Sequence, residues 1–235
     1  MPLTKQILQR INSNDPTLKE LNLSSQYPYL CVTDMQQLTD VLSRNTHLNI
    51  LILCENNIGD EGAVILATAL SKNSNVSRII DVSINNITDT GAIALLNATG
   101  IISLNLAGNC ITDAGLAPLS TNLTLQSLII HDNKLTDRSI QIFLANRNLQ
   151  EAIIDNNLIS TTGYQSVQDH ITQNVIRFVR EHTQKAVSAV AKLSPNKRLA
   201  IKQEISMILN EQLETANTTT PATFFSPSAT SILTT

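Results

Sequence analysis

Hydrophobic and polar residues recur in a fixed order along the first two-thirds of the chain. In the stretch LNLAGNCITDAG, Leu104 and Leu106 stand two residues apart and precede Asn109, Ile111 and Gly115. Such alternation over a short run predicts a β-strand, whereas the apolar spacing in DEGAVILATALSKN and DTGAIALLNA predicts short helices. The chain is therefore expected to pass repeatedly from a strand through a turn into a helix.

The same order returns at a nearly constant spacing. Five asparagines hold the position of Asn109 and lie 29, 24, 24 and 24 residues apart: Asn56, Asn85, Asn109, Asn133 and Asn157. An imperfect copy starts at Leu18 and has Gln26 in the asparagine position. This order identifies leucine-rich repeats, whose strands stack in parallel from copy to copy. We therefore predict an α/β leucine-rich repeat solenoid, a short horseshoe with a parallel β-sheet on its concave face and helices on its convex face.

The repeated asparagine and glycine have physical roles in such a stack. An inward asparagine carboxamide carries both donors and an acceptor, so it is expected to pair with buried backbone groups of its own coil and the next. A buried backbone group left unpaired costs about 1–3 kcal/mol. Gly115 and its equivalents are expected either to begin the convex helix or to admit close packing.

The pattern divides the chain into four segments. These are an N-terminal helical cap at 1–17, about six repeats at 18–163, a C-terminal helical segment at 164–214 and a disordered tail rich in Thr, Ser and Pro at 215–235. Ser194 and Pro195 predict that a fresh helix starts inside the third segment. That segment is expected either to cap the last repeat or to present a helix pair to a partner or to a second copy of the chain.

Two family resemblances extend this interpretation. The 24-residue units between 45 and 163 resemble the ribonuclease-inhibitor-like class and, more narrowly, the GALA-type repeats of bacterial effectors that are delivered into host cells. The composition of the tail is similar to that of translocation signals in some type IV effectors. INSNDPTLKELNL at 11–23 and LSRNTHL at 42–48 resemble the opening of the tropomodulin repeat domain, which implies actin-filament capping.

Composition narrows the classes of partner. The net charge of −3, with 15% charged residues, offers no basic surface for nucleic acid or for an anionic membrane. The three cysteines Cys31, Cys54 and Cys110 lack the spacing of a disulfide framework or a zinc site, and no cofactor is expected. The N-terminus shows no secretory signal, so we expect a cytoplasmic protein, or one secreted into a host cell without a cleavable signal peptide.

No group of residues has the spacing of a catalytic site. Cys54, His131 and Asp155 hold the same repeat position on the concave face, so they lie in one column that crosses the strands. Cys54 is nevertheless three strands from His131, roughly 14 Å at about 4.8 Å per strand. That distance is too long for a nucleophile and its base. His131 and Asp155 lie on adjacent strands and are expected to form a partly exposed ion pair. The protein is therefore predicted not to be an enzyme.

The concave face is predicted to bind a protein. Isoleucines gather in a front patch and a back patch with acidic and polar groups around them, an arrangement that suits protein recognition. The candidate contact residues are Ile50, Ile52, Ile79, Asp81, Asn105, Ile129, His131, Ile153 and Asp155. We interpret the chain as a non-enzymatic interaction module, first as a bacterial effector that binds a host protein, with an actin-associated, tropomodulin-like capping module as the alternative.

Overall fold

The computed structural model describes residues 4–25, 29–30, 32–73 and 78–192. The chain divides into two compact units, one that ends at Phe178 and one that begins at Val179. The first unit contains the sheet. In the part that the structure describes, the second unit is the continuation of one long helix.

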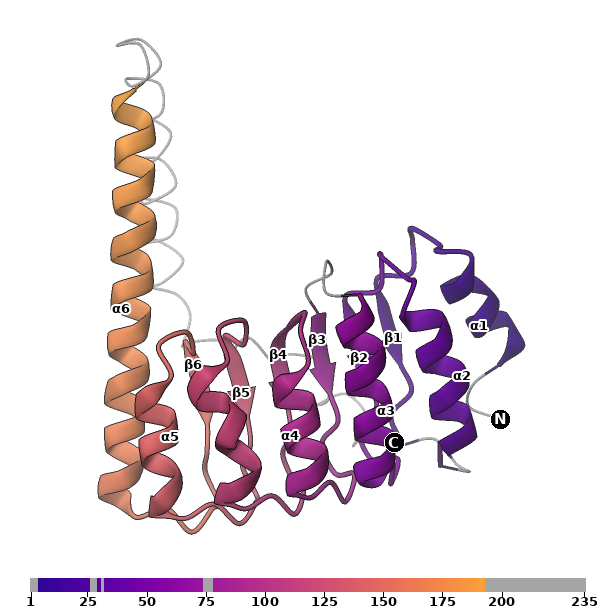
Figure 1. Cartoon of the computed structure of the whole chain (residues 1–235), viewed down its shortest axis with the longest axis horizontal. Coiled ribbons are helices and arrows are strands. Elements are labelled where there is room, and N and C mark those ends of the chain that lie inside the picture. Colours follow the sequence, from indigo (N-terminus) through magenta and orange to yellow (C-terminus); the bar gives the residue numbers. More distant parts are fainter. Residues whose placement is uncertain (1–3, 26–28, 31, 74–77, 193–235) are drawn as a thin grey trace, which may run out of the picture. The chain divides into compact units, whose positions relative to one another are not determined.

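Six short strands form one parallel sheet in which each strand pairs with its neighbours in chain order (Figure 1). The strands are β1 Glu20–Asn22, β2 Ile50–Ile52, β3 Arg78–Asp81, β4 Ile101–Asn105, β5 Ser127–Ile129 and β6 Glu151–Ile153. Leu51 is aligned with Leu21 on one side and with Ile80 on the other, and all three side chains are buried. This register stacks the same repeat position from strand to strand, and it confirms the predicted α/β solenoid.

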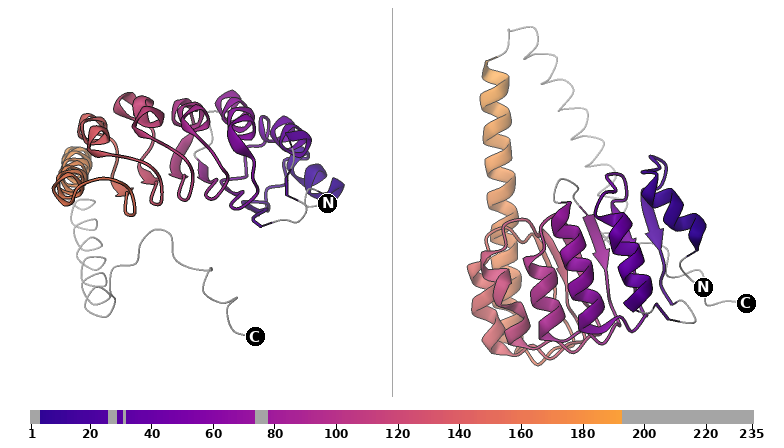
Figure 2. Two further views of the ribbon diagram at one scale, coloured as in Figure 1. Left: turned by 90° about the horizontal axis from the view of Figure 1, so that it is seen from below. Right: turned by 45° about the vertical axis from the view of Figure 1, so that its right-hand side comes forward.

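Helices lie on the side opposite the sheet's exposed face, as the first view in Figure 2 shows; α1 precedes the first strand, α6 follows the last, and the others connect consecutive strands. They are α1 Lys5–Asn12, α2 Val32–Leu42, α3 Gly59–Lys72, α4 Asp89–Asn97, the 3₁₀ helix η1 Asp113–Thr121, the 3₁₀ turn η2 Asp137–Ser139, α5 Ile140–Ala145 and α6 Thr161–Ala191. The tighter η1 contains Pro118. Proline supplies no N–H for an α-helical bond, which explains why this repeat departs from the α-helix of its neighbours.

The core lies between the sheet and the helices and consists almost wholly of aliphatic side chains. A typical repeat contributes one inward residue of its strand and one just after it, the aliphatic residue after the asparagine and the inner face of its helix. In the second repeat these are Leu51, Leu53, Ile58, Leu66 and Leu70, all buried. Because every repeat supplies the same set, the core is one continuous cluster along the first unit.

Helices cover both ends of this core. At the front, Thr4 caps α1 by accepting the N–H of Ile7 at 3.2 Å, and Ile11 of that helix is fully buried. At the back, the first turns of α6 bury Val167 and Ile171 against the last repeat. The helix runs without interruption to Ala191. The predicted break at 194–195, the rest of the helical segment and the tail lie outside the described residues.

Candidate protein-binding surface

The repeated asparagines form a ladder that joins each repeat to the one before it. Asn85 Oδ1 accepts the backbone N–H groups of Asn56 and Ile58, both at 3.1 Å, and its Nδ2 donates to the carbonyl of Leu53 at 2.9 Å. Asn109 makes the equivalent bonds to the repeat of Asn85. The expectation of a bridge to the next coil was therefore wrong in direction. The carboxamide points back along the stack, where the preceding turn has left its N–H groups without partners.

A second ladder, of aspartate and threonine, went unrecognised at the sequence level. Asp60 Oδ1 accepts the backbone N–H of Thr88 at 2.8 Å, and Oδ2 accepts the Thr88 hydroxyl at 2.5 Å. Two further pairs repeat both bonds, Asp89 with Thr112 and Asp113 with Thr136, and Asp137 repeats only the bond from the backbone N–H, that of Ser160. The signal was a Thr-Asp dipeptide that recurs at 88–89, 112–113 and 136–137, whereas the first carboxylate of the ladder, Asp60, follows a glycine. The ladder ends at Ser160-Thr161, which has no carboxylate to offer a further repeat.

The repeated glycine is explained by this second ladder. A Cβ atom on Gly115 would lie 2.6 Å from Asp89 Oδ1 and 2.8 Å from Ile111 Cγ2. A Cβ on Gly91 would likewise lie 2.7 Å from Asp60 Oδ1. Real side chains do not tolerate such distances, so the glycine admits the carboxylate of the preceding repeat. Close packing was the correct one of the two expectations.

A buried arginine joins two repeats near the front of the solenoid. Arg78 is 1% exposed, and its guanidinium donates to the carbonyl oxygens of Leu48, Asn73 and Asn45 at 3.2, 3.0 and 2.8 Å. Burial lowers the pKa of this side chain. The three carbonyls replace the water that the cation has lost, so Arg78 has a structural role in joining two repeats.

The front of the concave face carries an apolar patch. Ile50 and Ile79 are aligned on β2 and β3, and Ile52 lies next to Asp81 in the same register. All three isoleucines are half-buried, so each leaves part of its surface open to solvent. We call Ile50, Ile52 and Ile79 the front patch.

Polar side chains beside the front patch are held in fixed positions. Asp81 Oδ1 accepts the backbone N–H of Ser83 at 2.9 Å and the Ser83 hydroxyl at 2.7 Å, while Asn105 Nδ2 donates to Asp81 Oδ2 at 3.1 Å. Asn105 Oδ1 in turn accepts the N–H of Ala107 at 3.0 Å. The carboxylate and the carboxamide therefore present their remaining hydrogen-bonding capacity in a defined geometry.

The back of the concave face differs from the sequence-based expectation. Ile129 is aligned with Asn105 and Ile153 as predicted, but it is only 4% exposed and offers almost no surface for contact. Ile153 is half-buried. Alternation along a strand predicts the direction in which a side chain points. The exposed area of that side chain also depends on the neighbouring side chains, which the alternation does not describe.

His131 and Asp155 have different partners from those predicted. His131 Nδ1 lies 2.5 Å from Asp132 Oδ2, so the expected pair with Asp155 is replaced by a pair with the next residue in the chain. Asp155 instead interacts with Tyr164 at the start of α6. Burial first, and then the charge of Asp155, raise the pKa of Tyr164. The left-handed backbone at Asp132, with φ of 56°, turns its carboxylate toward the imidazole.

The cysteine on this face lacks the features of a nucleophile. Cys54 is half-buried, and burial raises the pKa of its thiol although a hydrogen bond with Ser83 opposes the shift. β2 and β5 are separated by β3 and β4, which keeps Cys54 three strands from the strand that precedes His131. Among the described residues, no group of three His, Cys, Asp or Glu side chains is placed to hold a metal ion. None of the described helices is long and apolar enough to span a membrane.

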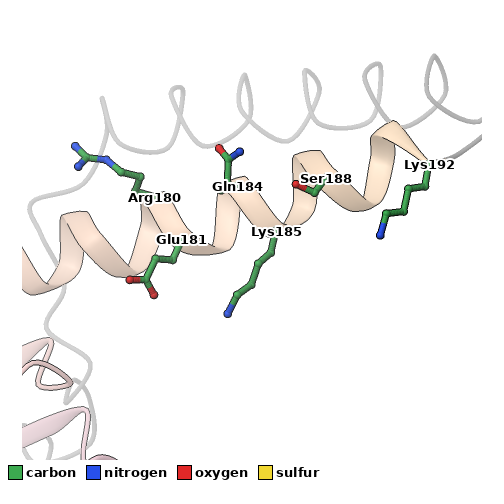
Figure 3. Close-up of a pocket in the computed structure, with 6 residues that line it drawn as sticks. All are labelled: Arg180, Glu181, Gln184, Lys185, Ser188 and Lys192. Carbon is green, nitrogen blue, oxygen red and sulfur yellow. The ribbon is translucent and has the colours of Figure 1, made fainter.

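The later turns of α6 offer a surface of a different kind. Figure 3 shows six side chains along this part of the helix, Arg180, Glu181, Gln184, Lys185, Ser188 and Lys192, which line a hollow of about 670 Å³. The set is mainly basic and polar. All six of these described residues belong to the second unit, and they come from one helix or its end.

Comparison with known proteins agrees with this architecture. A family model described as Leucine Rich repeat matches residues 44–67, 78–96 and 101–120. The protein is therefore built from leucine-rich repeats arranged as an α/β solenoid. No curated protein sequence matches the chain at a significant level.

Two solved structures are similar to the chain at low sequence identity. The chain is similar to actin-binding site 2 of leiomodin-1, with a TM-score of 0.52 and 19% identity over 80% of this chain and 99% of that one. It is also similar to the C-terminal domain of tropomodulin from Caenorhabditis elegans, with a TM-score of 0.45 and 17% identity over 75% of this chain and 96% of that one. At 19% identity, the similarity to leiomodin-1 shows the fold alone.

Proposed function

We propose that this protein is a non-enzymatic module that binds another protein through the front of its concave face. The observation that carries the proposal is the front patch, three half-buried isoleucines on adjacent strands beside the fixed side chains of Asp81 and Asn105. An apolar centre with a polar margin is the usual composition of a protein interface. The strands are already ordered, so little conformational entropy is lost when a partner docks.

The backbone at Ile84 supports recognition in the same region. Ile84 follows β3, is 55% exposed and has a φ of 53°, in the left-handed region that β-branched residues avoid. The equivalent positions in later repeats are Gly108, Asp132 and Asn156, residues that adopt this conformation more readily. An exposed isoleucine at a strained position favours a role in contact over a role in stability.

Two settings are proposed for this binding. The first is a bacterial effector that acts on a host protein, supported by the 24-residue repeats and their resemblance to GALA-type repeats. The second is an actin-binding module, favoured by the similarity to a domain of leiomodin-1 that is named as an actin-binding site. In both settings the same concave surface makes the contact.

The test compares two matched substitutions in one column of the sheet. Ile52→Glu places a charge in the front patch, whereas Ile153→Glu places the same charge on β6, at the other end of the column. A host-cell protein retained by the wild type and by Ile153→Glu but lost by the folded Ile52→Glu variant would support the proposal. Equal retention by both variants would contradict it.

Purified filamentous actin separates the two settings. Co-sedimentation of the wild type with actin, lost in Ile52→Glu and kept in Ile153→Glu, would support the actin-binding module. Failure of the wild type to co-sediment, together with retention of a different protein, would support the effector setting. Circular dichroism of each variant confirms that the repeats remain folded.

A further inference from the structure

One series of backbone hydrogen bonds runs from strand to strand and stops at the last repeat. Leu106 donates its N–H to the carbonyl of Ile129 at 2.7 Å, and Ile130 donates to the carbonyl of Ile153 at 2.8 Å. The next donor in this series is Ile154. No acceptor among the described residues pairs with its N–H.

Two further series end in the same way. Their last pairs are Asp132 with the carbonyl of Asp155 at 3.1 Å and Leu135 with Oδ1 of Asn157 at 3.0 Å. The next donors are the N–H groups of Asn156 and Ile159, and neither has an acceptor in the part of the chain that the structure describes. The edge of the sheet thus presents three donors in the geometry that every earlier repeat uses to bind its successor.

The three donors lie beside a hollow of about 240 Å³. It is lined by Ile154, Asp155, Asn156, Asn157, Ile159 and Tyr164, together with the first residue of α6. The other half of the β6 edge is already occupied, because Gln168 of α6 donates to the carbonyl of Ala152 at 3.0 Å. Among the described residues, none pairs with the carboxyl-terminal half of this edge, which has the length of a short peptide.

We propose that this edge binds an extended peptide segment of a partner protein as a short seventh strand, parallel to β6. The repeats define the chemistry of that segment. In the fourth repeat, the acceptors are the carbonyls of Asn105 and Ala107 and the side-chain oxygen of Asn109. The peptide must likewise supply two carbonyls two residues apart and, two residues further on, an asparagine side chain. This site is separate from the front patch and does not depend on the proposed function.

The charge at the edge selects the middle residue of the peptide. In the parallel register, the peptide residue that supplies the second carbonyl lies next to Asp155. Ala107 lies next to His131 in the same way, and His131 lies next to Asp155. Asp155 is exposed and bears a carboxylate. A lysine or arginine at this position of the peptide therefore gains an ion pair at the edge.

The probe is a hexapeptide with blocked termini, Leu-Asn-Leu-Lys-Gly-Asn, which copies residues 104–109 with the change A107K. Amide hydrogen exchange, read residue by residue by NMR on the full chain, reports the site directly. Saturating peptide should slow exchange at Ile154, Asn156 and Ile159 by about tenfold. A peptide with alanine in place of its last asparagine, the copy of Asn109, should lose the protection at Ile159 and keep it at Ile154.

Two variants on α6 control for non-specific binding. Thr161→Trp fills the hollow, and Thr172→Trp places the same ring on an exposed position of the same helix outside it. Protection should disappear in the first variant and persist in the second, and it should also persist in Ile52→Glu. The proposal is overturned if the three amides gain no protection at about 5 mM peptide, or if Thr161→Trp shows the same protection as the wild type.

Discussion

Asp60 in one repeat accepts two hydrogen bonds from Thr88 in the next, one from the backbone nitrogen at 2.8 Å and one from the hydroxyl at 2.5 Å. The same carboxylate accepts the N–H of Gly91 at 3.0 Å. One side chain at the start of α3 therefore fixes the turn that leads into α4. Together with the asparagine ladder, it sets the spacing of neighbouring repeats where the chain passes from the strand into the convex helix.

Replacement of this carboxylate should loosen the front of the stack. Asp60→Ala is expected to lower the free energy of unfolding by about 1–2 kcal/mol, because Thr88 and Gly91 lose their acceptor. Urea unfolding followed by circular dichroism measures the change. Glu61→Ala, at the exposed next position of α3, is the control and should alter stability by no more than about 0.5 kcal/mol. Equal losses in the two variants would contradict the assigned role of Asp60.

The same contact predicts a dependence on pH. Burial raises the pKa of Asp60, but hydrogen bonds from the Thr88 side chain and from the backbones of Thr88 and Gly91 outweigh it and lower the pKa below its ordinary value of 3.8. A lowered folded-state pKa contributes stability that is present above pH 3.8 and is lost as the pH falls through the folded value. The difference in unfolding free energy between wild type and Asp60→Asn should therefore shrink below about pH 4. An unchanged difference between pH 7 and pH 3 would disprove this.

Repeat periodicity was sufficient to predict the sheet. The Leu-x-Leu segments gave the position of the strands and their parallel register, because the inward residue of each copy has to meet its equivalent in the next. Periodicity did not give the exposure of Ile129 or the partner of His131. Both depend on local backbone, such as the left-handed conformation of Asp132, and on neighbouring side chains.

The bonds between repeats were only partly accessible from the sequence. The role of Asn109 could be predicted because a carboxamide that follows a strand has few other roles. The direction of its hydrogen bonds, toward the preceding repeat, could be seen only in the stacked structure. The dipeptide Thr88-Asp89 was visible as a repeated pair of residues, but its threonine bonds to the preceding repeat and its aspartate to the following one, which the sequence does not show. The open edge at Ile154 is recognised by following the backbone donors from strand to strand through the whole sheet. The sequence of a single repeat does not reveal it.

Glycine at the start of the convex helix should resist substitution because of the carboxylate behind it. Gly115→Ala would place Cβ 2.6 Å from Asp89 Oδ1, and we expect a loss of about 1–3 kcal/mol in unfolding free energy. If the carboxylate is the main obstacle, the same substitution in an Asp89→Ala background should cost less. A double-mutant cycle measured by urea unfolding gives this coupling. Simple additivity would show that Ile111, and not Asp89, sets the requirement.

Ile84 provides a test that separates binding from stability. Ile84→Asn keeps a side chain at the position but relieves a β-branched residue from its φ of 53°, so unfolding free energy should rise by about 1 kcal/mol. If Ile84 contacts the partner, the same variant should bind more weakly although it is more stable. Val64→Asn changes an exposed aliphatic residue on α3, which is 39% exposed, and should show neither gain nor loss of binding. A more stable Ile84→Asn variant with unchanged affinity would place the partner elsewhere on the concave face, because strain without contact has no part in recognition.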